Sequence, residues 1–220
     1  MPNWCQNNLI LSHKDPKKIE MVIEAIENDR FFDTIKPMPQ ELRETISGGL
    51  GAGTPEQKAL EEQQASNKAK YGYPTWYEFA NCEWGTKWDA QDAEIINVTE
   101  PEWVDHGNGL KLIDASVFVS FATAWASPIG IYEELVEMGF EVDGRYYESG
   151  CGFAGWFTNE GGDSYFEWES LQNAIDILPD ELDEEFNIIE NLEEWIDDQA
   201  EEERRDEKNG LYPDKLDDAN

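Results

Sequence analysis

The side chains that could act as nucleophiles or metal ligands are few and widely spaced. The chain contains Cys5, Cys82, Cys151, His13 and His106, and no other cysteine or histidine. A nucleophilic triad needs a base near its nucleophile, and a zinc site needs closely spaced Cys or His pairs. Neither pattern occurs, so the sequence predicts no catalytic residue, no metal site and no cofactor. Three separate cysteines form no disulfide framework and are typical of a reducing cytoplasm.

The glycine-rich segment GGLGAGTPEQK, residues 48–58, resembles a phosphate-binding loop only in part. Gly48 and Gly53 have the required separation, but Thr54 and Pro55 follow where Lys and Ser or Thr are needed. Thr54 also occupies the place of the third glycine in a dinucleotide-binding fingerprint. Two neighbouring carboxylates can act in acid–base catalysis. In a chain with 49 acidic residues such pairs arise by chance, so they do not identify an active site. The sequence therefore nominates no enzyme active site.

The segment GYPTWYEFANCEWGTKWDA, residues 72–90, concentrates aromatic side chains. Helical spacing of its first aromatic residues predicts a short helix that ends near Gly85. We interpret the aromatic side chains as a structural cluster, because aromatic residues dominate core burial. A partner-binding patch is the second interpretation, and a platform for stacked bases is the third. The residues that would form a ligand or interface cluster are Trp4, Trp84, Trp88, Trp125 and Tyr147.

Hydrophobic periodicity predicts an α+β fold. Residues 3–12 and 115–125 alternate as strands, whereas 16–29 and 127–139 have helical spacing. Without an excursion at about 30–92, the order is strand, helix, strand, strand, helix, strand. This order predicts a ferredoxin-like split βαβ sandwich with an antiparallel sheet, and a turn at 159–162 adds a hairpin.

Three segments follow from this assignment. We expect a ferredoxin-like domain at 1–170, an acidic amphipathic helical extension at 171–210 and a frayed tail at 211–220.

The formal net charge of -33 is the strongest compositional signal. It disfavours direct binding to nucleic acid and to anionic membranes, since both require cationic side chains. No apolar run is long enough to span a membrane. We expect a protein partner with a basic, nucleic-acid-binding surface; oligomeric state stays open. The alternative is that the acidity serves only solubility.

The acidic side chains concentrate near the C-terminus. Leu182, Phe186, Ile189, Leu192 and Ile196 recur at steps of three and four, which predicts one amphipathic helix over 180–207. Such a helix would be about 40 Å long at about 1.5 Å per residue. Its outer face would carry the candidate partner-binding carboxylates Glu184, Glu185, Glu193, Glu194, Asp197, Asp198, Glu201 and Glu202.

Four segments resemble the YubB-like family of phage and plasmid proteins. They are MPNWCQNNLILS at 1–12, CEWGTKWDA at 82–90, FVSFATAWASPIGIYEELVEMGFEV at 118–142 and YYESGCGFAGWF at 146–157. The sequence departs from the family at Ala126-Ser127-Pro128, where a Pro-Pro turn is expected. The resemblance implies a ferredoxin-like domain in a cytoplasmic protein of a bacteriophage or conjugative element. It implies no enzymatic activity.

Two functional hypotheses follow. The first is a non-enzymatic inhibitor of a host nucleic-acid-binding or defence protein, which imitates the charge of DNA. The alternative is a small-molecule or nucleotide-binding protein or enzyme. Its site would lie between the sheet and the aromatic excursion, at Trp88, Asp89, Trp125, Tyr147 and Glu148.

Overall fold

The computed structural model describes residues 3–105 and 110–208. The chain divides into two compact units, residues 1–165 and 166–220, and each is described by itself. His106 and the tail predicted at 211–220 lie outside the described residues. No described helix is both long enough and apolar enough to cross a lipid bilayer.

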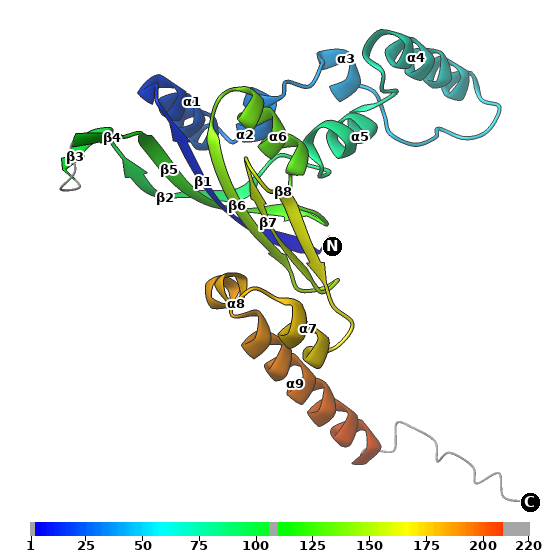
Figure 1. The fold of residues 1–220 in the computed structure, drawn as a ribbon. Helices are drawn as coiled ribbons and strands as arrows, with labels where there is room; N and C mark the ends of the chain where they lie inside the picture. Colours follow the sequence, from blue (N-terminus) through cyan, green and yellow to red (C-terminus); the bar gives the residue numbers. More distant parts are fainter. Residues whose placement is uncertain (1–2, 106–109, 209–220) are drawn as a thin grey trace, which may run out of the picture. The chain divides into compact units, whose positions relative to one another are not determined.

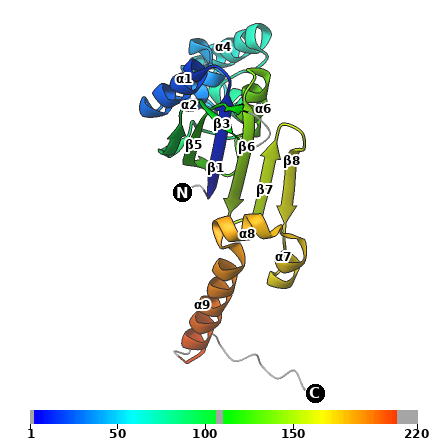
Figure 2. The same ribbon diagram turned by 60° about the vertical axis from the view of Figure 1, so that its left-hand side comes forward.

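The first unit is built on a six-stranded antiparallel sheet with the order β2-β5-β1-β6-β7-β8 (Figures 1 and 2). The strands are β1 (Trp4–His13), β2 (Gln91–Thr99), β5 (Ala115–Ala124), β6 (Glu141–Glu148), β7 (Phe153–Thr158) and β8 (Gly162–Glu167). A separate ribbon pairs β3 (Glu102–Asp105) with β4 (Leu110–Ile113). The α+β class predicted from the sequence is confirmed.

Alternation along the central strand β1 sets the two faces of the sheet. Leu9 and Leu11 are buried and pair with Val119 and Val117 of β5, whereas Ile10 between them is exposed. Side chains of a strand alternate between faces, so one face carries the core. Helices α1 (Pro16–Glu27) and α6 (Ile129–Glu137) pack on this face (Figure 1).

The predicted helix at 16–29 is confirmed as α1, and its first turn shows why it begins there. Asp15 is the N-cap and accepts a hydrogen bond from the backbone N–H of Lys17, while Pro16 takes the first position. Ile19, Val22 and Ile26 are buried. Capping and an apolar stripe therefore act together, as the sequence indicates.

The excursion between α1 and β2 is largely helical. It contains α2 (Phe31–Ile35), α3 (Gln40–Arg43), α4 (Pro55–Tyr71), α5 (Trp76–Phe79) and a π-helical turn, η1 (Ala80–Trp84). The turn ends at Gly85, which has φ 85°, as the sequence predicts. Residues 30–40 have no clear period and read as a connector, but Phe31 and Phe32 of α2 belong to the core.

The second unit contains α7 (Leu171–Ile177), α8 (Asp180–Phe186) and α9 (Ile188–Lys208). The prediction of one helix over 180–207 is wrong, because Asn187 adopts a left-handed conformation with φ 50° and ψ 45°. Asn tolerates this conformation better than most residues. The Asp183 carboxylate then accepts a hydrogen bond from the N–H of Ile189 at the start of α9, at 2.7 Å. The break is thus stabilised on both sides.

Candidate functional sites

Six of the eight predicted partner-binding carboxylates lie in two adjacent rows on α9. Residues four apart on a helix lie on the same face. One row contains Glu193, Asp197 and Glu201, and the next contains Glu194, Asp198 and Glu202, all exposed. Like charges at this spacing cost a helix about 0.2–0.5 kcal/mol per pair. The arrangement therefore does not serve the stability of α9.

The break at Asn187 separates the other two carboxylates from these rows. Glu184 and Glu185 belong to α8, so the eight side chains do not share one helix face as predicted. The described 21 residues of α9 span about 32 Å at about 1.5 Å per residue, rather than about 40 Å.

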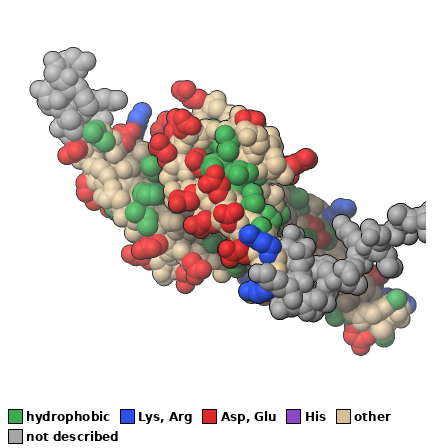
Figure 3. Space-filling view, turned by 90° about the horizontal axis from the view of Figure 1, so that it is seen from below, with side chains coloured by type: hydrophobic (Ala, Val, Ile, Leu, Met, Phe, Trp, Pro, Cys, Tyr) green, Lys and Arg blue, Asp and Glu red, His purple; other side chains and the backbone are tan. Residues whose placement is uncertain are grey.

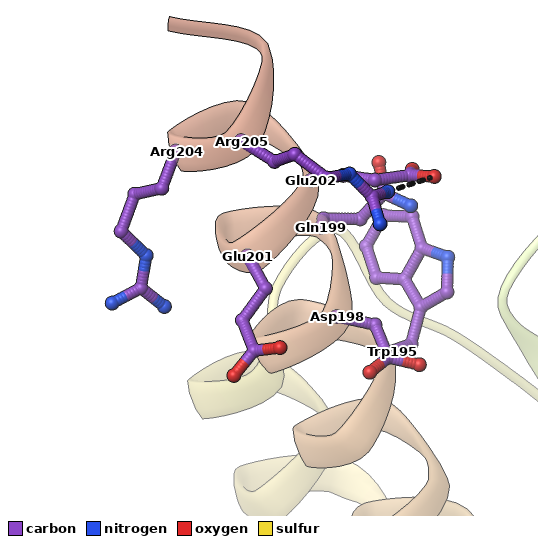
Figure 4. Close-up of a pocket in the computed structure, with 7 residues that line it drawn as sticks. All are labelled: Trp195, Asp198, Gln199, Glu201, Glu202, Arg204 and Arg205. Atoms are coloured by element: carbon purple, nitrogen blue, oxygen red, sulfur yellow. Dashed lines mark hydrogen bonds and ion pairs between the residues drawn. The ribbon is translucent and has the colours of Figure 1, made fainter. Parts of the chain in front are cut away.

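The far end of α9 combines acidic, basic and aromatic side chains. Arg205 forms an ion pair with Glu202 at 3.3 Å, and Figure 4 shows the Trp195 ring on the same side of the helix. Trp195 is 61% exposed. A shallow hollow on the helix surface is lined by Trp195, Asp198, Gln199, Glu201, Glu202, Arg204 and Arg205. Acidic side chains predominate over basic ones on the face seen in Figure 3.

The aromatic segment divides into a buried part and an exposed part. Trp84 is buried, and its ring packs edge-on against Phe32 and Phe79, with ring centroids 6.1 and 6.0 Å apart. Its Nε1–H donates a hydrogen bond to the carbonyl oxygen of Lys36 at 2.9 Å. The structural interpretation therefore holds for Trp84. By contrast, Trp88 is 36% exposed, and its ring lies 6.3 Å from that of Trp4.

The remaining aromatic candidates lie apart from this pair. Within the described residues Trp125 makes no ring contact with another tryptophan; it is exposed and has φ 72°. Tyr147 is buried in β6. Glu148 beside it is buried too and accepts hydrogen bonds from the N–H groups of Gly150 and Cys151. The structure thus brings Trp4 and Trp88 together, not all five side chains.

A cleft of about 490 Å³ lies beside Trp88. Its walls carry Trp76, Trp84 and Trp88 together with Arg30, Arg43 and Lys87. These cations come from three separate parts of the chain, so no local sequence pattern predicts that they lie together. The cleft is the feature that sequence reasoning missed, although Trp88 and Asp89 were among the residues of the alternative hypothesis.

Asp33 holds the two arginines of the cleft. Its carboxylate accepts hydrogen bonds from Arg30 at 3.0 Å, from Arg43 at 2.5 Å and from the N–H of Met38 at 3.0 Å. The Asp33 side chain is only 9% exposed. Burial raises the pKa of this carboxyl, but the hydrogen bonds from Met38 and the arginines outweigh burial and hold the pKa below its ordinary value.

The lowered pKa of Asp33 predicts a pH-dependent contribution to stability. The folded pKa is below the unfolded value of about 3.9, so the contribution is complete above that pH and is lost as pH falls through the folded pKa. We expect Asp33→Asn to lower the free energy of unfolding by about 1–2 kcal/mol at neutral pH. The deficit should shrink below about pH 4. Urea unfolding at several pH values measures it, with exposed Glu62→Gln as the control.

Asp89 connects the aromatic segment to α2. Its carboxylate accepts hydrogen bonds from the N–H groups of Phe32 at 2.7 Å, Asp33 at 3.1 Å and Ala90 at 2.8 Å. Burial raises the pKa of Asp89, and the three hydrogen bonds oppose this only in part. Its oxygens are therefore committed to the backbone rather than to a ligand or a substrate.

Of the three cysteines, Cys82 and Cys151 are exposed and Cys5 is buried. No group of three or more His, Cys, Asp or Glu side chains among the described residues is arranged to hold a metal ion. Cys5 is buried, and burial raises the pKa of its thiol far above the ordinary value. A protonated, buried thiol is a poor nucleophile.

Comparisons with known proteins give a weak structural likeness. No protein-family model matches the chain, and no curated protein matches it. The chain is similar to the crystal structure of a protein called api92 from Yersinia pseudotuberculosis, of the family model DUF1281. That likeness has 10% sequence identity and a TM-score of 0.33, and it covers 77% of this chain and 99% of the other. At these values it carries no argument about fold or function.

Proposed function

We propose that this chain is a non-enzymatic, strongly acidic binding protein of a bacteriophage or mobile element. It binds and inhibits a host nucleic-acid-binding or defence protein by presenting carboxylates in place of DNA phosphates. The observation that carries the proposal is the pair of exposed carboxylate rows on α9. The phage or mobile-element origin rests on the resemblance of the sequence to the YubB-like family.

The physical basis is electrostatic. Successive carboxylates in each row are about 6 Å apart along the helix axis at about 1.5 Å per residue. Duplex DNA carries a phosphate about every 3.4 Å on each strand. A protein surface that binds phosphates with Lys and Arg is attracted to DNA and to the carboxylate rows alike. The net charge of -33 increases the rate at which such a partner associates with this protein. The same charge opposes direct binding to nucleic acid.

The strand order supports the ferredoxin-like part of the proposal. The four strands β6-β1-β5-β2 are neighbours in the sheet, α1 connects β1 to β2, and α6 connects β5 to β6. Split βαβ folds have this connectivity with all neighbours antiparallel. In the proposal the domain supports the acidic unit and has no catalytic role.

The test is capture of partners from a bacterial lysate by the full chain. The variant changes Glu193, Glu194, Glu201 and Glu202 to Gln and Asp197 and Asp198 to Asn. The control carries Gln at six exposed glutamates of α1, α4 and α6, Glu20, Glu24, Glu27, Glu62, Glu133 and Glu137. Both variants change the net charge equally, so only the location of the charge differs between them.

We expect the wild type and the control to retain a nucleic-acid-binding protein that duplex DNA displaces. The α9 variant should retain at least tenfold less of this protein, because several charge contacts are lost together. Equal capture by both variants would contradict the proposal. So would a wild type that retains no such protein at low salt, where electrostatic attraction is strongest.

A further inference from the structure

The cleft beside Trp88 has the size and the lining of a small-molecule site. Its volume of about 490 Å³ lies within the range of about 300–1,000 Å³ that ligand pockets occupy. Trp76 and Trp84 form part of its wall, and Trp88 offers an exposed ring. Flat aromatic walls favour a ligand with a flat ring, since stacking uses the whole face.

The cations of the cleft indicate the charge of such a ligand. Lys87 holds its ammonium group 4.4 Å from the centre of the Trp88 ring. Among the described residues no carboxylate lies within ion-pair distance of Lys87, although the chain has 49 acidic residues. Arg30 and Arg43 each bond Asp33 through one nitrogen, so each planar guanidinium retains further N–H donors.

Of the three carboxylates that line the cleft, Asp33 and Asp89 are occupied, whereas Asp29 is exposed at its edge. Asp33 accepts from two arginines and one backbone N–H, and Asp89 accepts from three backbone N–H groups. An aromatic cage for a quaternary ammonium needs aromatic faces that are open to the cation. Here Lys87 already places a cation over Trp88, which leaves the site complementary to an anion.

We propose that this cleft binds a small aromatic anion of the nucleotide class. The base stacks on Trp76, and the phosphate is bound by Lys87, whose ammonium group lies over Trp88, and by the N–H groups of Arg30 that Asp33 does not use. A free nucleotide is the occupant rather than a nucleic-acid chain, because a polyanion is repelled by a protein of charge -33. This inference is independent of the carboxylates of α9, which belong to the other unit.

Calorimetric titration of the full chain with adenosine 5′-monophosphate tests the inference. Binding at or below about 1 mM is expected, with weaker binding of adenosine, which lacks the phosphate. Lys87→Gln removes the unpaired cation and should weaken binding roughly tenfold or more. Trp76→Leu should weaken it as well, since the stacking face is lost. Lys58→Gln, an exposed lysine of α4, should leave it unchanged.

Three outcomes would overturn the inference. The first is the absence of saturable binding at millimolar nucleotide. The second is equal affinity in Lys87→Gln and wild type, with circular dichroism showing both folded. The third is tighter binding of an oligoadenylate or of choline than of the mononucleotide, which would indicate a nucleic-acid groove or a cation cage instead.

Discussion

Replacing Gly130 with alanine is expected to lower the free energy of unfolding by about 3 kcal/mol, the upper end of what overpacking usually costs. A Cβ atom at Gly130 would lie 2.3 Å from the carbonyl oxygen of Glu83 and 2.9 Å from its carbonyl carbon. Both atoms are backbone, so no side-chain rotation relieves the clash. Helix α6 and the π-helical turn η1 would have to separate.

The separation would disturb more than the contact itself. Glu83 precedes Trp84, which is packed on Phe32 and Phe79 and bonded to Lys36. A shift of η1 would therefore move the wall of the cleft as well. Urea unfolding followed by tryptophan fluorescence measures the change, and an unchanged slope would indicate that only stability has changed.

Gly49→Ala is the matched control for this substitution. A Cβ atom at Gly49 would meet only the side-chain oxygen of Gln57, at 3.4 Å. It should change stability by less than about 0.5 kcal/mol. If the two variants unfold at the same urea concentration, the close approach of α6 and η1 does not limit stability.

Elements that depend on neighbouring residues could be predicted from the sequence. The cap at Asp15 and the stripe of α1 lie within one segment, and the alternation of β5 reports one buried face directly. The break at Asn187 could not be predicted in this way. The apolar residues before and after it continue one stripe, and its stability depends on the Asp183 carboxylate six residues from Ile189.

The candidate sites show the same division. The exposed carboxylates of α9 follow from a local pattern of charge, and the structure exposes six of them as expected. The cleft depends on tertiary contacts. Trp84 and Trp88 flank Gly85 in similar sequence surroundings, and only the packing of α2, α5 and α6 around Trp84 decides which ring is buried.

The contacts of α2 explain why the sequence of residues 30–40 does not by itself predict a helix. The first N–H groups of any helix lack partners within it, and Arg30 provides no side-chain cap for α2. The partners come from Asp89, 57 residues beyond Phe32. A helix of five residues is not stable alone, so α2 forms only when the aromatic segment is folded against it.

Asp89→Ala should accordingly lower the free energy of unfolding by roughly 3 kcal/mol, because it leaves three N–H groups without their acceptor. Asp89→Asn retains one oxygen acceptor and turns the other into a donor that faces the N–H of Asp33, so its loss should be smaller, about 1–2 kcal/mol. Glu94→Ala, at an exposed position of β2, serves as the control in the same urea titration.

The order of these variants distinguishes a structural carboxylate from a ligand-binding one. If Asp89 served mainly to contact a ligand, Asp89→Ala would unfold like the Glu94→Ala control, and only nucleotide binding would change. A structural Asp89 predicts that α2 loses its order first, which releases Phe31 and Phe32 from the core. Hydrogen exchange at the N–H groups of Phe32 and Asp33 would then be faster in Asp89→Ala before the sheet is affected, since local opening has a lower free energy than global unfolding.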